Sequence, residues 1–351
     1  MDAPPDFPTL LDIDLSSSCN LRCSFCHLSH FDPRQPGQVS LEQFDRWLGP
    51  HLARLQSLTL FSKFEPTTCR DLVPILRRVN AHGLEIYFST NGLKMSDELL
   101  AEMVGRVRFL TLSVTGFDAA AYRRHMGVEG LERVEGNLRR LRDEKKRRGT
   151  ELPILRLSTV AMSDTFAELT RAVDFAHRHE MAAGVQVTSL IAHHATMVPQ
   201  MPMMQPEAFL AAARVARDHA RALGIPFVLQ SGELDDNDRE TRELGHRPCR
   251  LPWQRLSLQP NGEVYPCPVS YTPVGHLERE DLAAIWRGEP LARFRLGVND
   301  EARMNPECRV CTHCRTKSVR RRESNDFSQA ELSYAGMTRK SRPPEKGASV
   351  V

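Results

Sequence analysis

The sequence predicts an α/β protein built from about six βα units around a parallel sheet, followed by a small cysteine-rich region. Short apolar segments alternate with amphipathic helical patterns between residue 10 and about residue 230, which is typical of repeated βα units. The length of 351 residues exceeds one average domain and leaves room for an additional unit. The nine cysteines fall mainly into one group near each end of the chain, so two metal-binding regions are predicted at opposite ends of an ordinary scaffold.

The composition is that of a globular protein outside the membrane. Hydrophobic residues make up 41% and charged residues 26% of the chain, and the formal net charge of +3 is too small to indicate a nucleic-acid partner. No apolar segment reaches transmembrane length, and the N-terminus is acidic and proline-rich where a signal peptide would be basic and then apolar. We therefore expect a cytoplasmic protein, in which abundant cysteines indicate metal or redox chemistry instead of disulfides.

The strands are expected where short apolar runs recur. The predicted strands are residues 10–15, 58–61, 85–90, 109–114, 154–160 and 185–190, with a further strand at 226–230. Because such strands run parallel, their C-terminal ends should place the following loops along one rim, where ligands of these folds usually bind.

The helices between these strands carry recognisable start signals. Ser40 stands three residues before Gln43, as in a capping box, and Ser96 precedes another amphipathic segment. Asp71 precedes a helix that tolerates a proline in its first turn. The stretch 129–148 is highly charged but repeats leucine and valine at helical spacing, which predicts a surface helix with one buried stripe.

Changes in composition along the chain divide it into three predicted regions. A polar segment after residue 230 resembles a linker, and Pro260-Asn261-Gly262 is a good turn between two short strands. The last residues are basic and poor in core-forming side chains, which favours a mobile, solvated tail. The predicted boundaries are 8–232 for the main domain, 233–318 for the cysteine-rich domain and 319–351 for the tail.

The first cysteine group is a triplet in the loop after the first strand. Cys19, Cys23 and Cys26 follow a C-x3-C-x2-C spacing. Three thiolates can hold three corners of a four-iron cluster and leave the fourth iron open to a substrate or cosubstrate. The alternative is a zinc site completed by His27 or His30.

The triplet and the loops after the next strands resemble the radical S-adenosylmethionine (SAM) superfamily over about residues 8–230. Glu65-Pro66 follows the second strand, Asn91-Gly92 the third, and Ser113 opens a segment similar to a further family motif after the fourth. The sequence departs from the family pattern at Ser62, Lys63 and Phe64, where small residues are usual, and at Thr115, where aspartate is common.

The resemblance implies a partial (β/α)6 parallel barrel with a SAM-binding 4Fe-4S cluster on the triplet. It also implies SAM contacts from Phe25, Glu65, Ser89, Asn91, Ser113 and Ser158. The implied reaction is one-electron cleavage of SAM to a 5′-deoxyadenosyl radical, which abstracts a hydrogen atom from the substrate. An external electron donor such as flavodoxin or ferredoxin is implied as a partner.

The second cysteine group contains Cys249, Cys267, Cys308, Cys311 and Cys314. Taken alone it could form a zinc ribbon from two cysteine pairs. Beside the first group it resembles the auxiliary iron-sulfur domain of the SPASM and twitch types. Five cysteines are too few for two clusters, so a twitch-like arrangement with one auxiliary 4Fe-4S cluster is expected. By that match its ligands are Cys249, Cys267, Cys308 and Cys311, with Cys314 as an alternative.

The first functional expectation is oxidation or epimerisation of a hydroxylated small molecule of the sugar or aminocyclitol type in natural-product biosynthesis. The position of the triplet leaves little chain before it for a leader-peptide recognition domain, which favours a small molecule. The alternatives are a maturase of ribosomally made peptides and, in another class, a zinc-stabilised binding module without catalysis. Epimerisation would need a hydrogen donor, for which Cys314 and Cys69 are candidates, although a packing role is expected for Cys69. His193-His194 at the rim could contact substrate or transfer a proton, or be an exposed loop pair.

Overall fold

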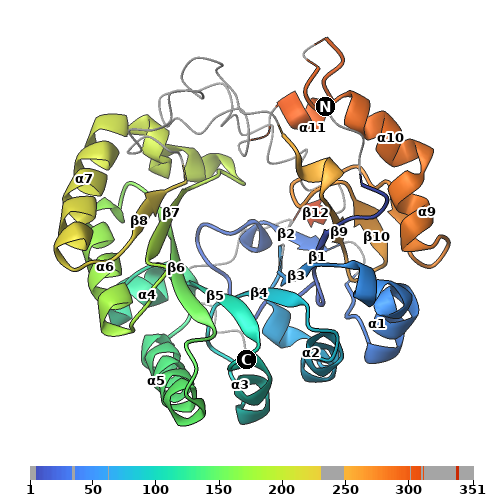
Figure 1. Ribbon diagram of the computed structural model, residues 1–351. Coiled ribbons are helices and arrows are strands. Elements are labelled where there is room, and N and C mark those ends of the chain that lie inside the picture. The colour runs from blue at the N-terminus through green and yellow to red at the C-terminus, as the bar shows by residue number, and fades with distance from the viewer. Residues whose placement is uncertain are drawn as a thin grey trace.

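The computed structural model shows a curved sheet with helices on its outer face (Figure 1). It describes residues 5–33, 36–61, 63–230, 249–300, 302–309, 311 and 337–339. The predicted linker after residue 230 lies largely outside this set, as does most of the tail.

Seven parallel strands form the main part of the sheet, and each corresponds to a predicted segment. In spatial order they are β1 (Leu10–Ile13), β3 (Ser57–Leu60), β4 (Glu85–Thr90), β5 (Val107–Ser113), β6 (Ile154–Ala161), β7 (Val185–Ser189) and β8 (Phe227–Leu229). The α/β class and the parallel sheet are therefore confirmed, and the strand ends differ from the expected ones by no more than a few residues.

The cysteine-rich region continues this same sheet. Strand β9 (Arg255–Leu258) pairs parallel to β1, β10 (Glu263–Tyr265) pairs antiparallel to β9, and β11 (Gly275–His276) completes the edge. The predicted turn lies between β9 and β10, where Gly262 adopts a φ of 89° that favours glycine. The two cysteine groups are thus distant in sequence but adjacent in space.

The helices begin largely where the sequence predicts. Ser40 forms the expected capping box with Gln43 at the start of α1, and the Ser96 side chain accepts a hydrogen bond from the Leu99 backbone N–H at the start of α3. The helices are α1 (Leu41–Leu48), α2 (Leu72–Asn80), α3 (Asp97–Met103), α4 (Ala119–Met126), α5 (Leu131–Arg148), α6 (Leu169–Arg178), α7 (Pro206–Ala222), α9 (Leu282–Arg287), α10 (Glu289–Leu296) and α11 (Pro306–Arg309). Short 3-10 helices are η1 (His27–Ser29), η2 (Gly49–Arg54), η3 (Pro66–Thr68), η4 (Phe166–Glu168), η5 (Ala195–Gln200), η6 (Pro202–Met204) and η7 (Leu251–Trp253).

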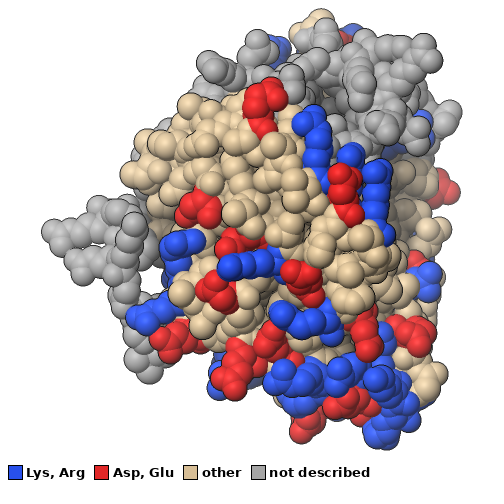
Figure 2. Space-filling model, turned by 90° about the vertical axis from the view of Figure 1, so that its left-hand side faces the viewer, with Lys and Arg blue, Asp and Glu red and all other residues tan. Residues whose placement is uncertain are grey.

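Helix α5 is the predicted surface helix with one buried stripe. Val134, Leu138 and Leu141 are buried, whereas most of its charged residues are exposed. Figure 2 shows that basic and acidic side chains are interspersed on this side of the molecule and gather at its lower end.

One hydrophobic core connects the barrel strands to the cysteine-rich region. It includes Leu11 and Ile13 of β1 together with Leu256 of β9 and Trp286 of α9, all nearly inaccessible to solvent. A separate small cluster of methionines around Met197 and Met201 packs beside the loop after β7. Within the described tail, Met337–Arg339 form β12, which pairs antiparallel with β2 (Phe31–Pro33). No described helix combines the length and apolar character needed to span a bilayer.

Candidate active site

The loop that carries the first cysteine triplet is held in place by hydrogen bonds from several directions. The Ser24 backbone N–H donates to the His125 carbonyl at the end of α4 over 2.8 Å. The Ser29 hydroxyl donates to the Cys23 carbonyl over 2.7 Å, and the Arg22 guanidinium donates to the Cys19 carbonyl over 2.9 Å. These contacts fix the backbone from which the thiols project.

Gly127 allows α4 to approach this loop. It ends the helix in the left-handed region with a φ of 83°, and a Cβ atom there would lie 2.7 Å from the Arg22 carbonyl oxygen. Any other residue would push the helix away from the cysteine loop. The glycine is visible in the sequence, but the close approach is not.

The triplet thiols lie close enough to influence one another electrostatically. Burial, reinforced by Glu65 and Cys26, raises the pKa of Cys19 to about 12. The fully buried Cys23 has a pKa raised further by burial and by its two partner cysteines. Buried thiols become ligands only where a metal centre compensates the thiolate charge, so this wall of the molecule fits a metal cofactor.

The described residues of the triplet are not arranged around a single metal ion. Among the described residues, no three His, Cys, Asp or Glu side chains are arranged to hold one metal ion. A tetrahedral zinc would require its thiolates at about 2.3 Å from one centre. Because a four-iron cluster is larger than a single ion, its three cysteine corners can stand farther apart.

Glu65 is buried and fully engaged at the start of η3. Its Oε1 accepts from the Thr67 and Thr90 hydroxyls, each over 2.6 Å, and its Oε2 accepts from the Asn91 backbone N–H over 2.8 Å. Burial raises the pKa of the carboxyl, and these donors partly offset that effect. The Asn91 amide in turn donates to the Asn20 side chain over 2.7 Å. The loops after β1, β3 and β4 therefore form one hydrogen-bonded unit.

A cavity of about 390 Å³ joins the two cysteine groups. Its wall includes the triplet, Cys311 of the second group and most of the residues that the family resemblance assigns to SAM. These are Cys19, Cys23, Cys26, Phe25, Glu65, Ser89, Asn91, Ser113 and Cys311. Five of the six residues that the family resemblance assigns to SAM therefore lie on this wall, and the contribution of the second cysteine group to it was not anticipated.

Ser158 and Cys69 stand apart from this cavity. Ser158 lies on β6 in register with Ser113 but is not part of the wall. Cys69 is buried elsewhere, its thiol donates to the Val39 carbonyl over 3.5 Å, and burial raises its pKa to about 11. The geometry thus favours the packing role for Cys69 over that of a hydrogen donor.

Histidines from two loops meet at the cavity. His27 and His193 both line it, with ring centroids 5.8 Å apart, and His30 stacks on His194 at 4.9 Å. Burial lowers the pKa of His193 to about 3 and that of His27 well below its usual value. Both imidazoles are therefore neutral near pH 7 and can act as proton acceptors. His193 is thus a buried wall residue and not an exposed loop residue.

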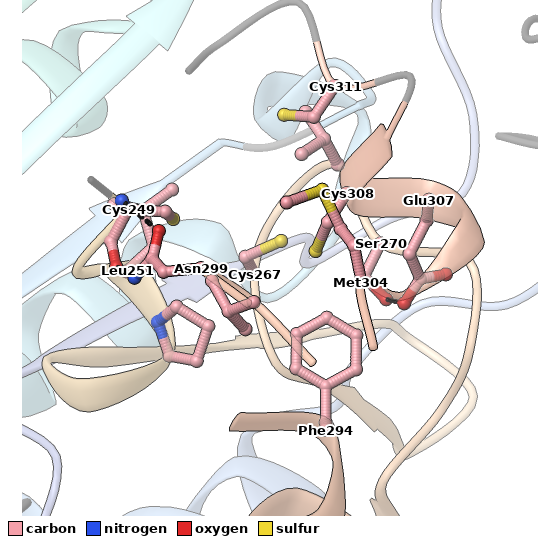
Figure 3. A pocket seen from close by; sticks show the side chains of 13 residues that line it. Cys249, Leu251, Cys267, Ser270, Phe294, Asn299, Met304, Glu307, Cys308 and Cys311 are labelled. Carbon is pink, nitrogen blue, oxygen red and sulfur yellow. Dashed lines mark hydrogen bonds between the residues drawn. The ribbon is translucent and has the colours of Figure 1, made fainter. Parts of the chain in front are cut away.

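The second cysteine group surrounds its own small pocket. Figure 3 shows Cys267 and Cys308 pointing toward the same space, with Cys249 on its other side and Cys311 above. Burial raises the pKa of Cys308 to about 12 and that of Cys267 further, and neighbouring cysteines contribute to both shifts. These four cysteines fit the expected ligand set, while Cys314 lies outside the described residues.

Three charged residues at the boundary between the two groups were not anticipated as site residues. Asp14 at the end of β1 accepts from the Lys63 backbone N–H over 2.9 Å and from the Gln259 side chain over 2.9 Å. Lys63 and Glu307 both line the cavity. An acidic residue directly after a buried strand is a usable signal for Asp14, but the other two depend on contacts between distant segments.

Comparison with known proteins agrees with this geometry. The model of the radical SAM superfamily matches residues 13–169, and the model of the iron-sulfur cluster-binding SPASM domain matches residues 249–315. The chain therefore contains a radical SAM domain followed by a SPASM domain. The first domain implies a 4Fe-4S cluster and SAM, and the second implies auxiliary iron-sulfur binding. The restriction to one auxiliary cluster stays a prediction.

Individual relatives of this radical SAM protein match along both domains. A PqqA peptide cyclase from Rhodopseudomonas palustris is 25% identical over 82% of this chain and 76% of the relative. Streptococcus suis SuiB, solved with its precursor peptide SuiA, has a TM-score of 0.63 at 17% identity over 82% of this chain and 66% of that chain. BtrN, solved with AdoMet and 2-DOIA, has a TM-score of 0.51 at 14% identity over 92% of this chain and 98% of that chain. The two structural matches establish a shared fold.

Proposed function

We propose that this radical SAM enzyme modifies a ribosomally made peptide. The observation that carries the proposal is the match to the PqqA peptide cyclase, which extends through both domains. The fold shared with SuiB, whose structure contains a precursor peptide, supports the same substrate class. The comparisons therefore favour the second of the sequence-based expectations over oxidation of a sugar or aminocyclitol.

The rim of the cavity also suits a peptide. Phe61, Ile191 and Val269 all line it, and they are 37%, 44% and 46% exposed. Few other large apolar side chains among the described residues are exposed to solvent. Exposed apolar side chains around a cavity commonly mark a site that binds apolar parts of a partner.

The cavity residues divide into cofactor-binding and substrate-facing groups. Cys19, Cys23 and Cys26 would hold the cluster, and Glu65 with Asn91 would hold the methionine end of SAM. Further SAM contacts would come from Phe25, Ser89 and Ser113 of the wall and from Ser158, which lies outside it. When bound, these cofactors supply a 5′-deoxyadenosyl radical that removes a hydrogen atom from the substrate. The buried walls exclude water from the reacting region.

The two cavity histidines would act on the substrate, and the second cysteine group would hold the auxiliary cluster. The neutral imidazoles of His27 and His193 stand where they can accept a proton as the modified peptide forms. Cys249, Cys267, Cys308 and Cys311 would hold an auxiliary cluster with four protein ligands, which closes it to substrate and suits it to electron transfer. An external flavodoxin or ferredoxin would supply the initiating electron.

A second candidate is oxidation of a hydroxylated small molecule, the first sequence-based expectation, and the fold shared with BtrN, whose structure contains AdoMet and 2-DOIA, is compatible with it. The two functions differ in the substrate that consumes SAM. Anaerobic holoenzyme with dithionite should be incubated with peptides encoded beside its gene, and with aminocyclitols in parallel. We expect 5′-deoxyadenosine formation coupled to a mass change of a peptide. Coupling to an aminocyclitol alone would replace the peptide assignment by the second candidate.

Two sets of variants test the assigned residues. Changing Cys19, Cys23 and Cys26 together to Ala should remove about half of the bound iron, because one of two four-iron clusters is lost. Cys69→Ala is the matched control, since this buried thiol lies outside the cavity. At the rim, Ile191→Ser should raise the KM for peptide several-fold, whereas Val215→Ser, at an exposed position on α7, should not.

A further inference from the structure

Lys63 occupies a special position in the cavity wall. It lies in the loop before Glu65, at one of the places where the sequence departs from the small residues of the family pattern. It is the only lysine or arginine among the described residues that line the cavity.

The Lys63 ammonium has no hydrogen bond or ion pair with any described residue, and it lies over the Tyr265 ring, 5.2 Å from the ring centroid. The nearby acids are engaged elsewhere. Asp14 accepts from backbone N–H groups and Gln259, Glu263 accepts from the Tyr265 hydroxyl over 2.7 Å, and Glu307 accepts from the Ser270 hydroxyl over 2.8 Å.

These acids still influence the charge state of Lys63. Burial lowers the pKa of its ammonium, and Asp14, Cys267, Glu263 and Glu307 act in the opposite direction. Burial has the larger effect, so the nearby acids only partly offset the cost of the charged form and do not bind it directly. A partly buried ammonium without a counterion is costly, and a ligand that brings a carboxylate would relieve that cost.

The neighbours of Lys63 place it toward the substrate. Lys63 lines the cavity together with the triplet on one side and with Pro268 and Cys311 of the second domain on the other. The methionine end of SAM belongs with Glu65. The ammonium of Lys63 instead lies over the Tyr265 ring of β10, 5.2 Å from its centroid, and Lys63 lines the cavity that joins the two cysteine groups.

We propose that Lys63 binds a carboxylate of the substrate and so selects peptides that present an acidic side chain or a free C-terminus in the cavity. This inference rests on the proposed function in assuming that the substrate is a peptide. The expected contact is a charge-assisted hydrogen bond, which contributes about tenfold or more to affinity when partly buried. An uncharged amide of the same shape would not gain that contribution.

The test uses anaerobic holoenzyme with SAM and ligand-observed NMR titration of matched probes. N-acetyl-Glu-N-methylamide is compared with its Gln counterpart, and N-acetylglycine with N-acetylglycinamide, so that side-chain and C-terminal carboxylates are distinguished. At least one acid should bind about tenfold more tightly than its amide. Lys63→Met should abolish that preference and Lys63→Arg should retain most of it. Lys94→Met, at an exposed position outside the cavity, is the matched control.

Several outcomes would overturn the inference. One is equal binding of acid and amide by the unaltered enzyme, and another is a preference that survives Lys63→Met. If the unaltered enzyme shows no preference for acids and Lys63→Met weakens SAM binding tenfold, the lysine binds the methionine carboxylate of SAM instead. If it only shifts the auxiliary-cluster potential measured by EPR titration, the lysine tunes that cluster. D-gluconate is the non-peptide probe: Lys63-dependent binding of gluconate alone would retain the carboxylate site and refute the peptide assignment.

Discussion

The ion pair between Asp12 and Arg255 should determine how firmly the two domains are joined. Asp12 lies in β1 with 3% of its side chain exposed, and its carboxylate contacts the guanidinium of Arg255 in β9 at 3.1 Å and 3.2 Å. Removing one partner of a buried pair costs about 3–5 kcal/mol, because the remaining charge is buried and unpaired. Since the Arg255 side chain is 26% exposed, we expect about 2–3 kcal/mol for Arg255→Met.

Amide hydrogen exchange is the appropriate assay because it resolves individual strands. A loss of about 2–3 kcal/mol in local opening free energy corresponds to roughly 30- to 150-fold faster exchange. The faster exchange should be confined to β1 and β9, while β6 and β7 serve as internal controls. Adding Asp12→Asn to Arg255→Met should restore much of the protection, because no unpaired charge then remains.

The pH dependence gives this prediction a second signature. Burial raises the pKa of Asp12, and Arg255 counteracts that effect. Without the arginine, the folded state binds a proton at Asp12 more tightly than the unfolded state, so stability is lost as pH rises through the folded pKa. The variant should therefore become progressively more impaired as pH rises from the ordinary carboxyl range through the raised pKa of Asp12. A cost below about 1 kcal/mol, or equal loss of protection in β6 and β7, would refute the reasoning.

Three further outcomes are expected. Gly127→Ala should cost about 1–2 kcal/mol or more from its left-handed backbone and lower the iron bound by the triplet, whereas Gly149→Ala, with a φ of 61° and open space around it, should affect stability alone. Glu65→Gln should weaken SAM binding about tenfold in equilibrium titration through loss of one charge-assisted contact, with exposed Glu98→Gln as control. His193→Phe should make urea unfolding less sensitive to acid between pH 6.5 and 5.5, because the native state resists protonating His193 while the unfolded state does not, so stability falls as pH drops. An unchanged pH slope would contradict that assignment.

Much of the barrel could be predicted because its signals are local. The apolar run at 85–90 is β4 with the same ends, and the serine and glutamine at the start of α1 form the expected capping box. The positions of the triplet and Glu65 could also be predicted from the sequence, since each follows its strand and the C-terminal ends of parallel strands share one rim.

The rest depends on pairings between segments far apart in the sequence. Strand β9 is a short apolar run without a signal for its partner, yet it aligns Leu10 with Arg255. Cysteine spacing likewise cannot show that Cys69 lies away from the cavity or that Cys311 lies on it. Lys63 could be noticed only as a departure from a family pattern, because its meaning comes from the cavity that it lines.

The continuous sheet has a mechanistic consequence. Because β9 is hydrogen-bonded to β1, and Asp14 contacts both the loop before Glu65 and Gln259 after β9, the two cysteine groups are placed by the backbone and not by a hinge. The separation between the two clusters should then vary little between the free and substrate-bound enzyme. Substrate selection must come from side chains that project into a space of fixed width. A lysine in that space can discriminate by charge without closure of one domain on the other, which makes Lys63→Met a test of specificity that leaves the fold intact.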